Sequence, residues 1–220
     1  MNYFNLHTHK ATNQPDVLEL VNQYPKECDV AIPFYSIGIH PWHIDENSIE
    51  LELAIISNQL QDNNCLAIGE CGLDKRIETN FDLQISVFEK QLLLAQNFQK
   101  PVIVHCVAAF QEVIEIKKRL KITVPMVIHG FSKNEQIAKS LIDNGFYFSF
   151  GKHLILNPAL ETVFKNIPND RFFLETDTIE EGIIKVYELA AHYKNIEMTE
   201  LQNTINTNFK TVFGATITTI

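Results

Sequence analysis

The sequence has little cysteine and no long apolar run, and these two absences exclude broad classes of protein. Its four cysteines form no Cys-x-x-Cys pair, and two of them lie inside apolar runs, where a reduced thiol packs as a small hydrophobe. No run reaches the roughly 18 apolar residues that a bilayer span requires, and the N-terminus has no basic segment leading into an apolar one. The sequence therefore predicts a cytoplasmic protein with no membrane segment and no disulfide framework.

Positive charge is also scarce. The chain has 18 lysine and arginine residues against 27 aspartate and glutamate residues, which gives a formal net charge of -9. This balance argues against a broad basic surface, so a nucleic-acid substrate would have to be held by local contacts. Bound divalent cations would help, because they offset nearby carboxylates. No pattern in the chain indicates an obligate protein partner.

Short apolar runs alternate with longer segments of helical period along the chain. Seven runs have the length and composition of strands, at residues 3–9, 30–40, 65–69, 101–105, 125–129, 146–150 and 171–177. Between them, residues 81–98 place apolar side chains at spacings of three and four, which is typical of an amphipathic helix. Ser132 and Glu135 fit a capping box that would begin a later helix.

This alternation predicts parallel strands joined by crossover helices, in an open sheet or a closed barrel. Seven strands and a final helix favour an α/β fold of the TIM type, a (β/α) barrel formed by a single domain over residues 1–220. No convincing strand run lies between residues 180 and 199. We therefore expect the barrel to be reduced or distorted at its eighth strand.

Polar residues close the predicted strands. They are His7 and His9, His40, Glu70, His105, His129 and Asp177. Because the C-terminal ends of all strands in a (β/α) barrel meet on one face, where active sites lie, we expect these side chains to converge. Taken singly, each of them could also cap a helix or bond to the backbone. Their shared position at strand ends favours a common site.

Imidazole and carboxylate groups in this arrangement suit one or two divalent metal ions. His7 and His9 are two residues apart on one strand, so their rings would lie on the same side, roughly 6 to 7 Å apart. Glu70 lies beside glycine, which lets the backbone approach a ligand closely, and its carboxylate could bridge two cations. Asp177 could both ligate a cation and accept a proton from water. The mixed donors favour zinc or manganese, whereas magnesium prefers oxygen ligands.

These motifs resemble those of the TatD family of metal-dependent hydrolases, within the amidohydrolase-like barrels. The similarity runs nearly from end to end and rests on His7 to His9, Gly38 to Pro41, Gly69 to Asp74, His105, His129 to Phe131 and Glu175 to Asp177. Members of the family are described as nucleases, usually dependent on magnesium. The resemblance implies one ion held by His7, His9, Glu70 and Asp177, a second held by Glu70, His105 and His129, and His40 near the substrate.

Four positions depart from the family pattern. Asn5 replaces a typical aspartate two residues before the first histidine, which would remove a charge beside the metal. Val107 stands where the family commonly has an arginine, so a phosphate contact would be lost. Thr178 and Ile179 follow Asp177 in place of the usual Ser-Pro. These changes bear on substrate recognition more than on metal binding.

The leading hypothesis is a metal-dependent phosphodiesterase that uses a metal-activated water, with DNA as the favoured substrate. Asp177 and Glu70 would be catalytic, and His40, Lys75 and Arg76 would contact the substrate. Two alternatives stay open. One is a metal-dependent hydrolase of a carbonyl substrate, such as an amidase, a lactonase or an aminoacyl-tRNA deacylase, which Val107 and the acidic balance favour. The other is an interaction module that binds metal but has lost its catalytic activity. Asn5 and the short chain favour this alternative.

Overall fold

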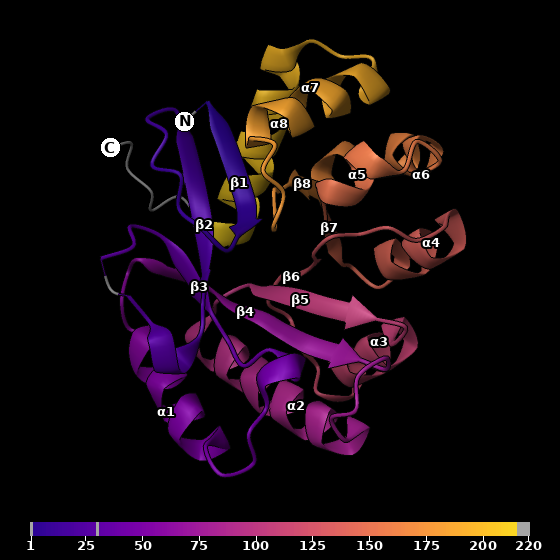
Figure 1. The fold of residues 1–220 in the computed structure, drawn as a ribbon. Helices are drawn as coiled ribbons and strands as arrows, with labels where there is room; N and C mark the ends of the chain where they lie inside the picture. The colour runs from indigo at the N-terminus through magenta and orange to yellow at the C-terminus, as the bar shows by residue number, and fades with distance from the viewer. Residues whose placement is uncertain (1, 30, 215–220) are drawn as a thin grey trace. The chain divides into compact units, whose positions relative to one another are not determined.

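The computed structural model describes residues 2–29 and 31–214, and its strands form one eight-stranded sheet in chain order (Figure 1). The strands are β1 (Tyr3–Thr8), β2 (Val17–Gln23), β3 (Tyr35–Ile37), β4 (Cys65–Asp74), β5 (Val102–Val107), β6 (Met126–Ile128), β7 (Tyr147–Phe150) and β8 (Phe172–Leu174). Neighbouring strands run parallel in the pairs β1–β2, β3–β4, β4–β5, β5–β6 and β7–β8. Parallel strands in this order define a TIM-type (β/α) barrel, so the predicted fold class is confirmed.

Helices occupy most of the connections between the strands. They are α1 (Ile49–Gln59), α2 (Phe81–Phe98), α3 (Phe110–Arg119), α4 (Glu135–Asp143), α5 (Lys152–Leu156), α6 (Leu160–Asn166), α7 (Ile183–Lys194) and α8 (Met198–Phe213), with short 3-10 turns η1 (Pro25–Glu27), η2 (Pro41–His43) and η3 (Asn169–Arg171). Among the residues described, no helix has both the length and the hydropathy that crossing a membrane would demand. The amphipathic helix predicted over residues 81–98 is confirmed with the same bounds.

The strand that the sequence did not predict is β2, which lies between the runs predicted at residues 3–9 and 30–40. Glu19 and Asn22 interrupt its apolar residues, and no α-helix separates it from β1 in the described part of the chain. The alternation of strand and helix therefore does not reveal it. Residues 180–199, in which no strand run was found, contain α7. The sheet thus has eight strands and is not reduced to seven.

Among the predicted boundaries that differ from the structure are those of β3 and α4. The run at residues 30–40 contains only the three-residue strand β3, and Val30, where the predicted strand begins, lies outside the described residues. Helix α4 is capped by Asn134, whose side chain accepts a hydrogen bond from the Ile137 N–H at 3.1 Å. Ser132 is therefore not the cap, because the asparagine two residues later is an equally good acceptor and lies next to the first helical residue.

The chain divides into two compact units, which are described separately. The terminal unit comprises residues 2–21 and 129–214, and the central unit comprises residues 22–29 and 31–128. That residues 1–220 form a single domain stays a prediction.

In the terminal unit, aromatic side chains hold β1 against α7 and α8. The Phe4 ring centroid lies 4.7 Å from that of Phe209 in α8 and 5.8 Å from that of Phe173 in β8, in edge-to-face geometry. The Tyr187 hydroxyl in α7 accepts a hydrogen bond from the Phe4 N–H and donates one to the Phe4 carbonyl, both at 3.0 Å. These contacts fix the strand that contains His7 and leads directly into His9.

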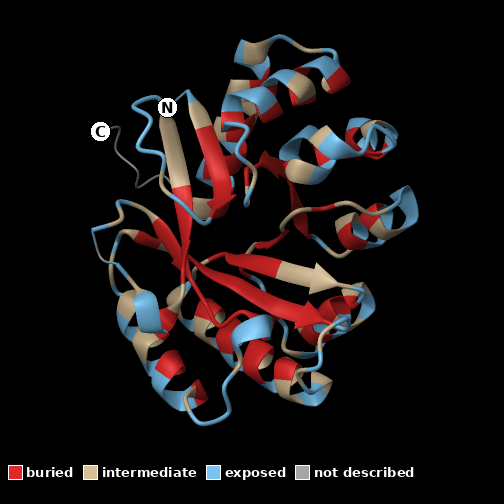
Figure 2. Cartoon of the chain, viewed as in Figure 1, coloured by how far each residue is buried: buried red, intermediate tan, exposed pale blue. Residues whose placement is uncertain are grey.

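In the central unit, two buried glutamines of α2 hold the ends of β3 and β4. Nearly every residue of β4 is buried, whereas α2 has one buried and one exposed face (Figure 2). Gln84 and Gln91 are seven residues apart and therefore share the buried face. The Gln91 amide bonds to the Ile39 N–H at 2.7 Å and to its carbonyl at 3.1 Å, and the Gln84 amide does the same for Asp74 at 2.8 and 3.1 Å.

We expect Gln91→Met to lower the free energy of unfolding by roughly 2 kcal/mol, because it leaves the buried N–H and carbonyl of Ile39 without their partner. Urea unfolding followed by circular dichroism would measure this change. Gln96→Met is the matched control, since Gln96 lies on the same helix but makes its hydrogen bonds to Thr123 at an exposed position, where water can replace them. Equal losses in the two variants would contradict the role assigned to Gln91.

Candidate metal centre

The predicted ligands lie on or just beyond the strands of their units. In the terminal unit, His7 is in β1, and His129 follows β6 directly. In the central unit, His105 is in β5 and Glu70 is in the middle of β4. The placement of Glu70 corrects the prediction that its strand ends at residue 69, because β4 continues to Asp74.

His7, His9 and Asp177 form the first group of possible metal ligands, all in the terminal unit. Their ligand atoms lie within 4.8 Å of one another. The Asp177 Oδ1 atom is 3.4 Å from the His9 Nε2 atom and 3.9 Å from the His7 Nε2 atom. The side chain of His7 is fully buried, whereas those of His9 and Asp177 are 31% and 26% exposed. The group is therefore open to solvent on one side.

Backbone pairing brings Asp177 to the end of β1. Thr8 and Asp177 form a parallel bridge, in which the Asp177 N–H donates to the His7 carbonyl at 2.9 Å and the His9 N–H donates to the Asp177 carbonyl at 3.4 Å. Asp177 has a φ of 55°, in the left-handed region, which aspartate tolerates better than most residues.

Asn5 is buried and holds the residue before Asp177. Its side-chain oxygen accepts from the Thr176 N–H at 3.0 Å, and its amide donates to the Thr176 hydroxyl at 2.9 Å. Where the family typically has an aspartate, this chain thus has an amide that bonds to both polar groups of Thr176. Asn5 acts on the shape of the site through these two hydrogen bonds and not through a charge.

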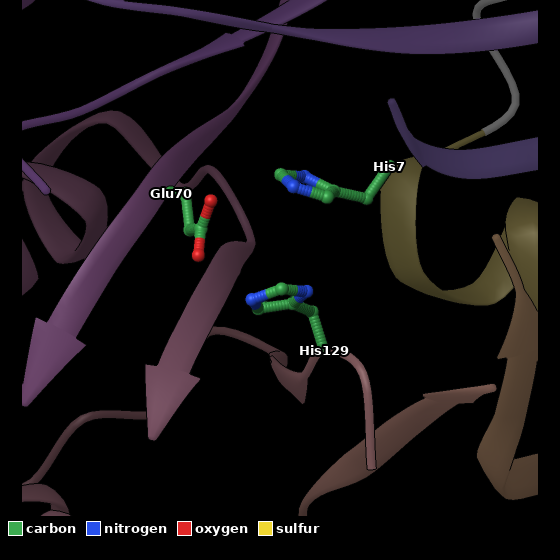
Figure 3. Close-up of side chains that lie close together, drawn as sticks. All are labelled: His7, Glu70 and His129. Carbon is green, nitrogen blue, oxygen red and sulfur yellow. The ribbon is translucent and has the colours of Figure 1, made fainter. Parts of the chain in front are cut away.

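His129 lies beside the first group. The imidazole rings of His7 and His129 lie side by side, with their centroids 4.6 Å apart (Figure 3). The His129 Nδ1 atom is 3.5 Å from the Glu175 Oε1 atom, and the other Glu175 oxygen accepts a short hydrogen bond from the buried Ser149 hydroxyl. A carboxylate behind a histidine is the arrangement that orients a metal-binding imidazole.

His40, Glu70 and His105 form the second group of possible ligands, all in the central unit. The Glu70 Oε1 atom lies 2.7 Å from the His105 Nδ1 atom and 3.1 Å from the His40 Nε2 atom. The two imidazole rings have centroids 4.4 Å apart. The same oxygen of the nearly buried Glu70 carboxylate therefore lies within hydrogen-bond distance of both rings.

The hydrogen bonds of His40 fix its tautomer. Its Nδ1 atom accepts a hydrogen bond from the Trp42 N–H at 3.1 Å, so the ring proton of the neutral form is on Nε2 and points at Glu70. Burial lowers the pKa of His40, and the hydrogen bond to Glu70 offsets only part of this effect, so the neutral form is favoured. A ring with both nitrogens engaged in this way is suited to orienting Glu70.

Asp74 lies on the other side of His105. Its Oδ2 atom is 3.5 Å from the His105 Nε2 atom and accepts a hydrogen bond from the Trp42 indole at 2.8 Å, while Oδ1 accepts from the Arg76 N–H at 2.8 Å. Burial acts to raise the pKa of Asp74, but the hydrogen bonds from Trp42, Arg76 and His105 outweigh it and lower the pKa. Asp74 is therefore ionised and faces the ring of His105.

Two further residues shape β4 around Glu70. The Asn22 side-chain oxygen at the end of β2 accepts a hydrogen bond from the Glu70 N–H at 2.6 Å. Gly72 has a φ of 151°, and a Cβ atom there would lie 1.9 Å from the His105 carbonyl oxygen. Only glycine lets β4 approach β5 this closely at His105.

The predicted substrate-binding residues Lys75 and Arg76 follow directly after β4. Both are exposed, but the Lys75 ammonium pairs with Glu112 and lies 5.3 Å from the Phe81 ring centroid. Val107 ends β5, paired with Asp74. Contact of Lys75 and Arg76 with a substrate stays a prediction.

Sequence reasoning missed the residues that hold the ligands in place. They are Asn22, Trp42, Asp74, Ser149 and Glu175. Two of these carry a local signal, since Asp74 closes the Gly-Glu-x-Gly-Leu-Asp motif and Glu175 opens Glu-Thr-Asp. Asn22 and Ser149 are single polar residues near the ends of strands, and nothing in the surrounding sequence marks them.

The donors of both groups are of kinds that a divalent metal ion accepts, and the spacing of the first group also fits such an ion. Ligands about 2.1 Å from one ion lie roughly 3 to 4 Å from one another. The separations of Asp177 from the two histidines, 3.4 and 3.9 Å, fall in this range. Imidazole nitrogens combined with carboxylate oxygens are donors that zinc, manganese and related ions accept.

Comparison with known proteins places these motifs in a family. The model of the TatD-related DNase family matches residues 2–214. An uncharacterized metal-dependent hydrolase of Haemophilus influenzae is 31% identical over 153 residues, which cover 66% of this chain and 58% of that protein. A 3'-5' ssDNA/RNA exonuclease TatD of Erwinia tasmaniensis is 30% identical over 175 residues, which cover 76% of this chain and 64% of that one. The matched part spans less than two thirds of the length of each of these relatives. Because the family model matches residues 2–214, the predicted resemblance to the TatD family is confirmed.

Solved structures agree on the fold. A TatD homologue from Escherichia coli K12 superposes with a TM-score of 0.82 at 18% identity, over 97% of this chain and 98% of that one. A TatD-family hydrolase from Entamoeba histolytica gives a TM-score of 0.81 at 16% identity over the same shares. At these identities the similarity concerns the fold alone.

We expect Asn5→Ala to weaken binding of Mn²⁺ or Zn²⁺ about tenfold or more, because Thr176 loses both partners and Asp177 is no longer held against His7 and His9. Isothermal titration calorimetry would measure the affinity. Asn5→Asp is the matched control, since its carboxylate can still accept from the N–H and the hydroxyl of Thr176. Unchanged affinity in Asn5→Ala would refute the positioning role.

Proposed function

This chain belongs to the TatD-related DNase family, and we propose from this premise that it is a divalent-metal-dependent hydrolase of phosphodiester bonds in single-stranded DNA. The observation that carries the proposal is the presence of two groups of imidazole and carboxylate donors, each gathered within one unit on or next to its strands. The Erwinia relative, named as an exonuclease of single-stranded DNA and RNA, supports the choice of substrate.

The proposed centre holds two ions. His7, His9, Glu70 and Asp177 would bind one, and Glu70, His105 and His129 would bind the other, with Glu70 as the common ligand. The grouping follows from the family resemblance. It is supported by the short separations within each unit, between Asp177 and the two histidines of β1 and between Glu70 and His105. Zinc or manganese is the proposed metal because both accept mixed nitrogen and oxygen donors.

The bound ions would supply Lewis acidity, which lowers the pKa of the attacking water and offsets charge on the phosphate oxygens. Asp177 is the proposed general base, since its carboxylate is partly exposed to solvent and is held in place by backbone hydrogen bonds on both sides. His40, neutral and hydrogen-bonded to Glu70, keeps that carboxylate oriented. Asn22 holds the Glu70 backbone, so two residues fix the ligand that both ions would share.

Hydrolysis of a carbonyl substrate is the second candidate. Val107 favours it, because this valine ends β5 where an arginine would supply a phosphate contact. The same metal ligands and Asp177 would serve an attack on an ester or amide carbon. A panel of carboxylic esters, tested beside single-stranded DNA, separates the two candidates by which bond is cleaved.

A decayed, non-catalytic module is the less favoured alternative. The short chain and Asn5 favour it, but Asn5 makes two hydrogen bonds to Thr176, and both groups of possible ligands are present.

Removing metal should abolish cleavage of single-stranded DNA. We expect protein dialysed against a chelator to be inactive and to regain activity with added Zn²⁺ or Mn²⁺, and to a smaller extent with Mg²⁺, since imidazole donors disfavour magnesium. Nucleotide release, with bound metal measured by elemental analysis, reports the result. Protein that binds metal yet cleaves no DNA with any of the three ions would overturn the nuclease assignment.

Asp177→Asn should lower kcat on single-stranded DNA by about 10²- to 10⁴-fold, because the amide cannot accept the proton. Steady-state kinetics together with the metal content of each variant would separate loss of the base from loss of the ligand. Asp170→Asn is the matched control, since Asp170 lies in the same unit with its side chain 72% exposed. A variant that keeps its metal and its full kcat would exclude Asp177 as the base.

A further inference from the structure

Trp42 is the only tryptophan of the chain, and it is 59% exposed. It lies in η2, directly after His40 and Pro41, in the central unit. Large aromatic side chains are usually well buried, and an indole this exposed gives up much of the stabilisation that burial would provide. Packing in the core therefore does not explain why a tryptophan occupies this exposed position.

The exposed indole is anchored at its polar edge. Its Nε1–H donates to the Asp74 Oδ2 atom at 2.8 Å, and the Trp42 backbone N–H donates to the His40 Nδ1 atom at 3.1 Å. Asp74 is itself held by the Arg76 N–H, which donates to its Oδ1 atom at 2.8 Å. The ring is thus held in one orientation by hydrogen bonds, and a ligand that contacts it would not have to immobilise it.

The anchored ring lies beside the second ligand group. Its centroid is 5.2 Å from that of His40 and 5.9 Å from that of His105, with interplanar angles of 87° and 75°. The indole therefore stacks on neither histidine, and the apolar surface that it exposes is left for another planar group. A substrate engaged by the neighbouring ligands would pass within reach of it.

Base stacking suits this chain for a further reason. The formal net charge of -9 provides no general attraction for a phosphate backbone, and Val107 provides no cation at the end of β5. Stacking on an aromatic ring acts at short range, does not depend on charge, and accepts any base because every base has a planar face. It requires the base to be unpaired.

We propose that Trp42 is a stacking platform for an unpaired nucleobase of the substrate, next to the metal centre. The inference rests on the proposed nuclease function and narrows it to single-stranded, base-bearing substrates. Trp42 is a specificity-determining residue that recognises the base beside the bond to be cleaved. Paired bases in a duplex, and sugar-phosphate chains without bases, would not use it.

The first test uses the fluorescence of the single tryptophan in the metal-loaded protein. A thymidine tetranucleotide with slowly cleaved phosphorothioate linkages should quench the emission in a saturable way. An abasic tetramer with the same linkages should leave it nearly unchanged. Equal quenching by both ligands, or by neither, would overturn the proposal, and this readout does not require that the protein cleave DNA.

The second test compares the kinetics of variants on two substrates, a thymidine tetranucleotide and an abasic tetramer with ordinary linkages. Trp42→Ala should lower kcat/KM about tenfold or more on the base-bearing substrate, mainly through KM, and leave the abasic substrate unaffected. Trp42→Phe should recover part of the loss, because phenylalanine can stack without the indole N–H. Leu51→Ala, which removes a side chain 62% exposed on α1 of the same unit, is the control and should match the wild type.

The outcomes distinguish the stacking role of Trp42 from the proposed nuclease function on which it rests. An equal loss on both substrates in Trp42→Ala would overturn the stacking role, because it would mean that Trp42 acts only through Asp74 and His105. Wild-type protein that cleaves neither substrate would refute the nuclease function, and the fluorescence titration would then decide alone whether Trp42 binds a base.

Discussion

The backbone pairing of Thr8 with Asp177 joins the first strand of the sheet to the segment that follows the last. It needs no long side chain, because the Asp177 N–H and carbonyl bond directly to His7 and His9. The Asp177 carboxylate therefore lies near both imidazoles wherever this bridge forms. The aromatic contacts of Phe4 and the hydroxyl of Tyr187 stabilise that pairing from α7 and α8. In the terminal unit, this bridge and the two hydrogen bonds of Asn5 to Thr176 connect the site to the fold.

In the central unit, the main constraint is the burial of Glu70, whose carboxylate lies in the middle of a strand. A buried charge is costly unless hydrogen bonds compensate it, and His40 and His105 both provide them. These partners are themselves positioned by buried amides, because Gln91 holds Ile39 beside His40 and Asn22 holds the Glu70 backbone. These hydrogen bonds link α2 and β2 to the segments that carry His40 and Glu70.

The sequence was informative where structure follows from local pattern. Seven strand runs and the helix over residues 81–98 stand out because their apolar residues recur at regular spacing, and polar residues at the run ends mark the ligands. The strand β2 does not stand out, since Glu19 and Asn22 lie among its apolar residues and no helix precedes it. Glu70 was placed at a strand end for a similar reason, because the two glycines around it suggest a turn where the chain continues as β4.

Residues that act through long-range contacts gave no signal of this kind. Ser149 reaches Glu175 across 26 positions of the chain, and Asn22 reaches Glu70 across 48. Each is a polar residue near the end of a strand, and its function depends on a partner that only the folded chain supplies. A hydrogen-bond partner far away in sequence cannot be read from spacing, because spacing reports only which residues share a face of one element.

The departures from the family pattern have different physical consequences. Asn5 exchanges a charge for an amide but keeps two hydrogen bonds to Thr176, so the geometry around Asp177 is retained. Val107 has no such compensation at its own position, because a valine cannot replace the cation of an arginine. With a net charge of -9 and no arginine there, recognition of a nucleic acid has to rely on contacts that are short in range and independent of charge. The anchored indole of Trp42 provides a contact of that kind, which explains why a side chain so exposed is held so firmly by Asp74.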